Sequence, residues 1–285
     1  MRTLIKSLGL IFIVGLVIAG CDSSNIQGPD TDEATDIMEM QNHAFLSGTL
    51  SLNPFTQNEL DNNWVADRQF PSGGVESVTF AGRDNVAAIG VVGADQSTAG
   101  AFYYFEGIKK VDNFGTDVQV DLYVPSEWQD ANIVNVGFWT SDDPLSAYPL
   151  IVYRNSSEVD AGFYTYDVVF DEDANQWVGV YNLSDAPVNY NSWNTLAVTL
   201  NTDEDEANYT VNGLESGSMY ASGDNIGQVF LNHYNDGVRD YTAYWHAGLL
   251  NPTSKNDCKK GGYAEYGFSN QGQCVRFVNT GKDSR

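Results

Sequence analysis

The chain has 285 residues, of which 38 are Asp or Glu and only 14 are Lys or Arg, so its formal net charge is −24. So acidic a surface repels the phosphates of nucleic acids and anionic lipids, which argues against a phosphate-binding role, and we expect no nucleic-acid partner. The 14 Phe, 16 Tyr and 6 Trp supply ample material for the core of one large domain.

Residues 1–20 have the layout of a bacterial secretory signal peptide. Arg2 and Lys6 precede an apolar run over residues 8–18, which is shorter than the ~20 apolar residues of a spanning helix. The run ends in Ile18-Ala19-Gly20-Cys21, which resembles the lipobox of bacterial lipoproteins. The resemblance implies cleavage before Cys21, lipidation of its thiol, and a mature protein anchored to a bacterial membrane and facing an extracytoplasmic space. An ordinary signal peptide followed by an incidental cysteine is the alternative, and the leaflet stays open.

Residues 21–60 separate this leader from the main domain. Residues 22–35 are rich in Ser, Asp, Gly and Pro and read as a tether. Residues 36–60 contain scattered apolar positions that fit either a short helix or a first edge strand.

Residues 61–250 have the composition of an all-β domain. Short runs rich in Val, Ile, Tyr, Phe and Trp alternate with turn residues, and about twelve such runs are too many for one open sheet. The sequence therefore predicts two packed antiparallel sheets. The predicted strands are Val75–Phe80, Val86–Val92, Ala101–Glu106, Thr116–Val124, Val134–Trp139, Leu150–Arg154, Gly162–Phe170, Trp177–Tyr181, Thr195–Leu200, Ala207–Val211, Gln228–Asn232 and Tyr241–His246.

Several of these strands alternate between an aliphatic face and a polar, aromatic face. In residues 118–124 (VQVDLYV) the aliphatic side chains alternate with an amide, a carboxylate and a phenol. Aromatic rings beside hydrogen-bonding groups suit sugar binding, because the rings stack on the apolar face of a sugar while its hydroxyls are hydrogen-bonded. The alternative is that both faces are buried. The candidate carbohydrate contacts are Asp121, Tyr123, Trp139, Tyr153, Tyr164, Tyr166, Tyr244 and His246.

Two neighbouring segments carry a family resemblance. Residues 191–199 (NSWNTLAVT) and 209–213 (YTVNG) resemble a recurring strand pair in concanavalin A-like sandwiches such as LamG and pentraxin-type domains, with Asn212-Gly213 as a tight turn of positive φ. The strand at 244–248 occupies the place of the last strand of that fold. The resemblance implies a two-sheet antiparallel jelly-roll sandwich. It says little about function, since the fold serves lectins, glycanases, lyases and adhesion modules.

Residues 251–285 form a separate tail with two cysteines. If Cys21 carries lipid, Cys258 and Cys274 are left as an even pair in an oxidising compartment, which predicts a disulfide. Closing that loop would contribute roughly 3 kcal/mol by loop-entropy arguments. The segment is similar to a small cysteine-paired module at the C-termini of bacterial secreted proteins, with Tyr263 where Trp is common. Zinc is a poor alternative, because the tail has no histidine.

Catalytic motifs fit poorly. Glycanases of the laminarinase type carry the motif E-x-D-x-x-E on one strand. The segment most similar to that motif begins Glu158-Val159-Asp160 and lacks the last acid. Gln41-Asn42-His43 has the Gln-x-His spacing of jelly-roll lyases but precedes the sandwich. His246 is either a base or an ordinary strand histidine.

Metal signals are equally weak. Residues 171–175 (DEDAN) have the start of a calcium-loop spacing, without the glycine and the twelfth-position acid, so a solvated hairpin turn is the simpler interpretation. The family resemblance still implies a structural Ca²⁺ held by loop oxygens at a position the sequence does not locate. No other cofactor is expected.

These observations favour a lipid-anchored protein whose sandwich binds carbohydrate without cleaving it. The alternatives are a polysaccharide-degrading glycanase or lyase, and a structural or adhesion module without a small ligand. Burial of Tyr123, Trp139 and Tyr166 together would favour the structural module.

Overall fold

The computed structural model describes residues 52–130, 134–171, 176–248, 254–256, 258–264, 268 and 270–280. The predicted signal peptide, the lipidation site Cys21, the tether and His43 lie outside these residues. Among the described helices, none is both long and apolar enough to cross a membrane.

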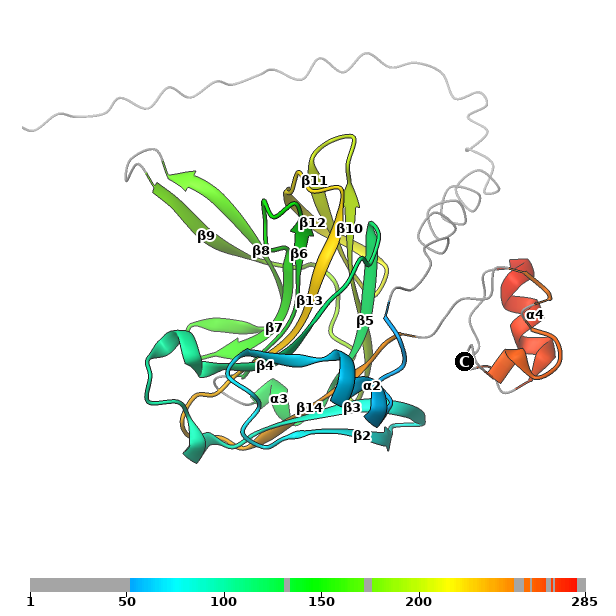
Figure 1. Cartoon of the computed structure of the whole chain (residues 1–285), viewed down its shortest axis with the longest axis horizontal. Coiled ribbons are helices and arrows are strands. Elements are labelled where there is room, and N and C mark those ends of the chain that lie inside the picture. The colour runs from blue at the N-terminus through cyan, green and yellow to red at the C-terminus, as the bar shows by residue number, and fades with distance from the viewer. Residues whose placement is uncertain are drawn as a thin grey trace, which may run out of the picture.

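The described strands form two seven-stranded sheets that pack as two layers (Figure 1). In sheet A the strand order is β1-β4-β13-β6-β7-β8-β9, and in sheet B it is β12-β11-β10-β5-β14-β3-β2. The strands of sheet A are β1 (Val65–Arg68), β4 (Phe105–Val111), β13 (Asn225–Tyr234), β6 (Val134–Asp143), β7 (Leu150–Ser156), β8 (Val159–Asp171) and β9 (Gln176–Leu183). The strands of sheet B are β12 (Leu214–Tyr220), β11 (Glu206–Val211), β10 (Ser192–Asn201), β5 (Asp117–Val124), β14 (Tyr241–His246), β3 (Arg83–Val91) and β2 (Val75–Phe80). All pairings between these strands are antiparallel, so the prediction of a two-sheet, jelly-roll β-sandwich is confirmed.

Period-two alternation explains the core. On β5, Val118, Val120 and Leu122 are at most 1% exposed, while Gln119 and Tyr123 on the opposite face stay partly exposed. Val118 and Val120 of β5 pair in register with the buried Val198 and Leu196 of β10, which extends the apolar surface across sheet B. Burying this surface against sheet A provides the main driving force for folding.

The strand boundaries show where composition misleads. β2 and β14 have the predicted bounds, but Ala101–Glu106 does not form the expected strand. Ala101–Tyr104 is instead a 3₁₀ helix, η2, and β4 begins at Phe105. The rings of residues 101–104 have strand-like composition, yet their side chains are exposed or half-buried and no neighbouring strand pairs with them. Strands β1 and β12 were not expected, since both are edge strands with few buried residues.

The described sandwich begins earlier than Trp64. Phe55 and Leu60 are buried in the main core, and the short helix α2 (Gln57–Asn63) starts with Thr56, whose Oγ1 accepts the Glu59 backbone N–H at 3.1 Å. The Glu59 carboxylate then accepts a hydrogen bond from Lys110 Nζ at 2.8 Å, where both side chains are nearly buried. These contacts fix α2 on the sandwich.

The turn predicted at Asn212-Gly213 is confirmed. Asn212 has φ of 53° and Gly213 has φ of 76°, and the turn joins β11 to β12. Both φ angles lie in the left-handed region, which asparagine and glycine adopt most easily. The Asn212 side chain also accepts the Thr195 backbone N–H at 3.0 Å, tying the turn to β10.

A buried histidine links the two sheets. His233 of β13 accepts a hydrogen bond at Nε2 from the indole N–H of Trp245 on β14, at 2.8 Å, and neither residue is exposed. Because the indole only donates, Nε2 must be unprotonated. Burial lowers the pKa of His233 to about 3, and the hydrogen bond between its other ring nitrogen and the Glu106 carbonyl only partly opposes that effect. The imidazole is therefore neutral in the folded protein.

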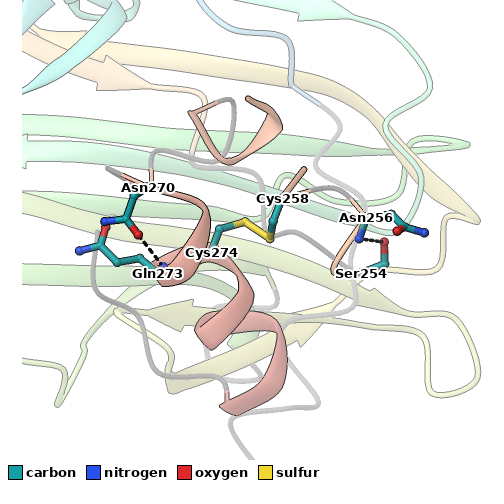
Figure 2. Close-up of a disulfide and its surroundings, with 6 residues drawn as sticks. All are labelled: Ser254, Asn256, Cys258, Asn270, Gln273 and Cys274. Atoms are coloured by element: carbon teal, nitrogen blue, oxygen red, sulfur yellow. Dashed lines mark hydrogen bonds between the residues drawn. A yellow bond between two sulfur atoms is a disulfide. The ribbon is translucent and has the colours of Figure 1, made fainter. Parts of the chain in front are cut away.

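The tail holds the predicted disulfide. Cys258 and Cys274 are bonded, with their Cα atoms 5.7 Å apart, and Figure 2 shows the bond running from residue 258 to helix α4 (Gln271–Thr280). Asn270 caps the start of that helix through the Gln273 backbone N–H at 3.0 Å. The two cysteines, Phe268 and Phe277 form a small core of their own. Between residues 248 and 254 the chain lies outside the described residues.

Candidate functional site

The outer face of sheet A carries a groove with a volume of about 870 Å³. Its floor comes from β1, β4, β13, β6, β7, β8 and β9, and the segment from Ser146 to Tyr148 and the end of β12 add side walls. The lining residues are Asp67, Arg68, Phe102, Phe105, Lys109, Trp139, Ser146, Ala147, Tyr148, Leu150, Tyr166, Tyr181, Met219, Tyr220, Gln228 and Phe230. A groove of this size, rich in aromatic rings, is suited to a ligand with flat apolar faces.

Trp139 lies at the centre of this groove. On β6 it is in register with Phe230 of β13 on one side and with Leu150 of β7 on the other. The Phe105 ring lies 5.5 Å from the indole, centroid to centroid. The pair Tyr166–Tyr181, with centroids 5.1 Å apart, continues the aromatic surface onto β8 and β9. Trp139 and both tyrosines are partly exposed, so their rings are available to a ligand.

Arg68 lies over this aromatic surface. Its guanidinium carbon is 4.5 Å from the Trp139 ring centroid and 4.8 Å from that of Phe105, which are cation–π distances. Arg68 Nε donates to Asp67 Oδ2 at 3.1 Å, and Lys109 Nζ is 3.8 Å from the other carboxylate oxygen. The Asp67 carboxylate therefore forms ion pairs with two cations.

A second arginine lies at the other end of the aromatic surface. The guanidinium carbon of Arg154, on β7, is 4.3 Å from the Tyr181 ring centroid and 5.4 Å from that of Tyr164. Burial raises the pKa of the Tyr181 phenol, and the positive charges of Arg154 and Arg68 oppose that rise. Both arginines thus act electrostatically on the same ring.

Polar atoms without partners lie beneath the rings. Trp139 Nε1, Ser141 Oγ and both side-chain polar atoms of Asn232 are buried and make no hydrogen bond to the described residues. Asn232 shares the outer face of β13 with Phe230, two residues away, so its amide faces the groove side of sheet A. Buried polar groups are usually paired, because each unpaired one costs about 1–3 kcal/mol. These atoms are covered by the protein itself, so they are not part of the surface that a ligand meets.

Glycine beside Trp139 lets the indole lie flat. A Cβ at Gly137 would be 2.4 Å from Trp139 Nε1 and 2.8 Å from Val152 Cγ1. On β4, on the far side of β13, a Cβ at Gly107 would be 2.3 Å from Asn232 Oδ1. The two glycines therefore leave space for the Trp139 and Asn232 side chains against the sheet.

We expect Gly137→Ala to displace the Trp139 indole. The protein should fold with a stability loss of about 1–3 kcal/mol, as for other overpacked sites. If the groove is the ligand site, ligand affinity should fall about tenfold, equal to about 1.4 kcal/mol. Gly162→Ala is the matched control, because its Cβ meets only the Leu183 side chain, at 2.7 Å. Isothermal titration of both variants measures the difference, and equal affinities would contradict the role given to the indole position.

Carboxylates are scarce in this groove. Asp67 is the only acidic residue among the residues that line it, and it is held by Arg68 and Lys109. On the outer face of the central strand β6 alternation places Asn135, Trp139, Ser141 and Asp143, and Asp143, at the exposed end of the strand, does not line the groove. The laminarinase-like segment at Glu158 and Asp160 lies instead at the β7–β8 turn, where both side chains are exposed.

A second polar and aromatic cluster lies on the outer face of sheet B. The Asp121 carboxylate forms an ion pair with Arg83 and accepts the Thr195 hydroxyl at 2.6 Å. Arg83 also lies over the Trp193 ring, 4.6 Å from its centroid, and 3.4 Å from His246 Nδ1. Both carboxylate oxygens are therefore satisfied within the protein.

The β2–β3 hairpin covers this second cluster. Phe80, at the end of β2, stacks on Tyr244 with centroids 3.6 Å apart and meets Tyr123 edge-on at 4.9 Å. Burial, and next the Arg83 charge, lower the pKa of His246 to about 4, with Asp121 opposing. His246 is 8% exposed and neutral near pH 7. The polar groups of this cluster are thus paired within the protein, while Phe80, Tyr123 and Tyr244 also line a second pocket of about 690 Å³.

No cluster of three or more His, Cys, Asp or Glu side chains within the described part of the chain is arranged to hold a metal ion. Residues 172–175 of the calcium-like segment lie outside that part. The Ca²⁺ expectation therefore stays a prediction.

Comparisons with known proteins find similar solved structures but no family. A scan of protein-family models and a search of curated proteins found no match. Similar solved structures include a glycoside hydrolase family 16 endo-glucanase from Bacteroides ovatus, with 9% identity, a TM-score of 0.45, and coverage of 65% of this chain and 93% of that one. The β-glucanase of Bacillus licheniformis has 15% identity and a TM-score of 0.40, covering 68% and 94%. An endo-β-1,4-glucuronan lyase from Trichoderma reesei has 10% identity and a TM-score of 0.38, covering 65% and 86%. At these values the likeness is one of fold alone.

The structure divides the eight predicted carbohydrate contacts among three places. Trp139, Tyr164 and Tyr166 belong to the outer face of sheet A, although Tyr164 is nearly buried and donates its hydroxyl to the Asp160 carbonyl at 2.9 Å. Four others gather on the covered face of sheet B, namely Asp121, Tyr123, Tyr244 and His246. The eighth prediction, Tyr153, is corrected. That residue is fully buried in the core between the sheets and donates to the Trp128 carbonyl at 3.1 Å.

Sequence reasoning missed much of the groove. The missed lining residues include Arg68, Phe105, Lys109, Tyr181 and Phe230, and the sequence also did not indicate Arg154, which lies over the Tyr181 ring. The sequence contained one signal for the cations among them. Only six Lys or Arg residues occur between positions 52 and 248 of a very acidic chain, so each of them was a candidate for a specific role. Tyr123, Trp139 and Tyr166 are all partly exposed. The condition that would favour a structural module, burial of all three, is therefore not met.

Proposed function

We propose that the groove on the outer face of sheet A binds a polysaccharide chain. The observation that carries the proposal is the combination, in one groove, of aromatic rings with polar side chains such as Arg68, Lys109 and Gln228. Sugar rings present an apolar face that stacks on indole or phenol, and a rim of hydroxyls that seek hydrogen bonds. The groove offers both kinds of contact in one place. We also propose that lipid on Cys21 anchors the protein to a membrane and that the groove faces an extracytoplasmic space.

We propose binding without cleavage as the main function. Hydrolysis of a glycosidic bond requires two carboxyl groups about 5–10 Å apart. The residues that line the groove include only Asp67, which already pairs with two cations. Degradation, by hydrolysis or elimination, is the alternative.

Affinity electrophoresis of the full chain in gels containing different polysaccharides tests the proposal. We expect retardation by at least one polymer, with no release of reducing ends or unsaturated uronates during overnight incubation. Release of either product would establish degradation in place of simple binding. If no polymer retards the protein, with or without millimolar Ca²⁺, the proposed function is wrong.

A further inference from the structure

Positive charge is concentrated at the groove in an otherwise acidic protein. Between residues 52 and 248 the sequence has six Lys and Arg residues, and three of them, Arg68, Lys109 and Arg154, lie on the outer face of sheet A. This concentration does not follow from composition, since the chain carries a net charge of −24.

The other three cations have carboxylate partners of their own. Lys110 pairs with Glu59 at 2.8 Å, Arg83 pairs with Asp121, and Arg239 lies 3.9 Å from Asp236. These pairs explain the presence of the three cations without any ligand.

The three groove cations share a single carboxylate. Asp67 contacts Arg68 and Lys109, whereas Arg154 has no ion pair within the described part of the chain and only stacks on Tyr181 and Tyr164. Asp160, which is exposed, also acts on Tyr164, but it makes no ion pair with Arg154. The groove is therefore left with an excess of positive charge that the protein itself does not neutralise.

The spacing of these cations suits an extended ligand. The Arg68 guanidinium lies over Trp139 on β6, and the Arg154 guanidinium lies over Tyr181 on β9. Three strand spacings separate β6 from β9, so the two charges are spread over roughly 10–15 Å of the sheet. Arginine side chains that are held on aromatic rings are ordered in advance and present donor pairs that match carboxylate or sulfate groups.

We propose that the polysaccharide bound in this groove is anionic, with carboxylate or sulfate groups that pair with Arg154, Lys109 and Arg68. This inference rests on the proposed function and specifies its ligand class. It also accounts for three cations that have only one carboxylate, that of Asp67, among them.

The test compares a polyuronate with its carboxyl-reduced form, which keeps the sugar rings and removes the charge. We expect the full chain to bind the polyuronate at least about tenfold more tightly, with affinity falling as NaCl is raised, because salt screens charge pairs. A sulfated galactan forms a third arm, and preference for it would identify sulfate in place of carboxylate. Equal binding of the reduced and native polymers would overturn the anionic inference but leave the proposed function in place. If the protein binds none of these three polymers and does not bind a neutral β-glucan either, both the anionic inference and the proposed function are overturned.

Charge-removing variants locate the effect. Arg154→Gln and Lys109→Gln should each weaken binding to the preferred anionic polymer by about fivefold or more and flatten its salt dependence. Arg239→Gln is the matched control, because it removes one positive charge outside the groove. Far-ultraviolet circular dichroism and melting temperature verify that all three variants fold. If Arg239→Gln weakens binding as much as Arg154→Gln does, the groove cations are not the determinant.

Discussion

Trp139→Ala should reduce polysaccharide affinity by about 30-fold or more, equal to about 2 kcal/mol, without unfolding the protein. Two contributions are lost together. They are the central stacking surface and the cation–π support that orders Arg68. Because the indole lies on the outer face of sheet A, its removal opens no cavity between the sheets.

Trp193→Ala is the control for this prediction. Trp193 is also a partly exposed tryptophan next to an arginine, but it lies on the outer face of sheet B under the β2–β3 hairpin. Its removal should change polysaccharide affinity by less than about twofold. Isothermal titration of both variants with the same polymer decides between the two faces. If Trp193→Ala loses binding and Trp139→Ala does not, the site is on sheet B.

Acid should destabilise the sandwich steeply through its buried histidines. The pKa of His233 is lowered to about 3 and that of His246 to about 4, against about 6.5 for histidine in an unfolded chain. Below pH 6.5 the unfolded state therefore binds protons that the folded state does not. The histidine contribution is fully present above about pH 6.5, and it is lost as the pH falls towards 4 and 3.

The His233→Gln variant separates the contribution of His233 to the pH dependence of stability from that of His246. Urea unfolding between pH 6 and pH 5 should show the free energy of unfolding decreasing about 1.4 kcal/mol less per pH unit in the variant than in the wild type. Within that window the lowered pKa of Glu59 contributes little, because its effect begins near pH 4.5. The slope is the readout, so any overall loss of stability from breaking the Trp245 bond does not affect the test. Identical slopes would mean that His233 takes up a proton in the folded state.

The fold was largely readable from the sequence because period-two alternation is a local property. Residues 118–124 indicated correctly which side of β5 enters the core, and Asn212-Gly213 indicated a turn that needs positive φ. Strand β12 was not readable, since an exposed edge strand buries little and leaves no alternation to detect. Residues 150–153 of β7 are apolar on both faces, so alternation could not show that Tyr153 points into the core.

The candidate site was predicted only in part, for a different physical reason. Alternation shows that a side chain points away from the core. It does not show to which of the two sheets the strand belongs. Trp139 and Tyr244 therefore received the same assignment, although they lie on opposite outer faces. Similarly, the positions of Arg68 and Arg154 over distant rings depend on strand order, which no local pattern encodes.

A crystal structure of the protein with an oligosaccharide from its preferred polymer tests the central claim most directly. We expect a sugar ring stacked on Trp139, with acidic groups near Arg68 or Arg154 and hydroxyls near Gln228. An oligosaccharide bound at the Phe80–Tyr244 face, with the sheet A groove empty, would contradict the account.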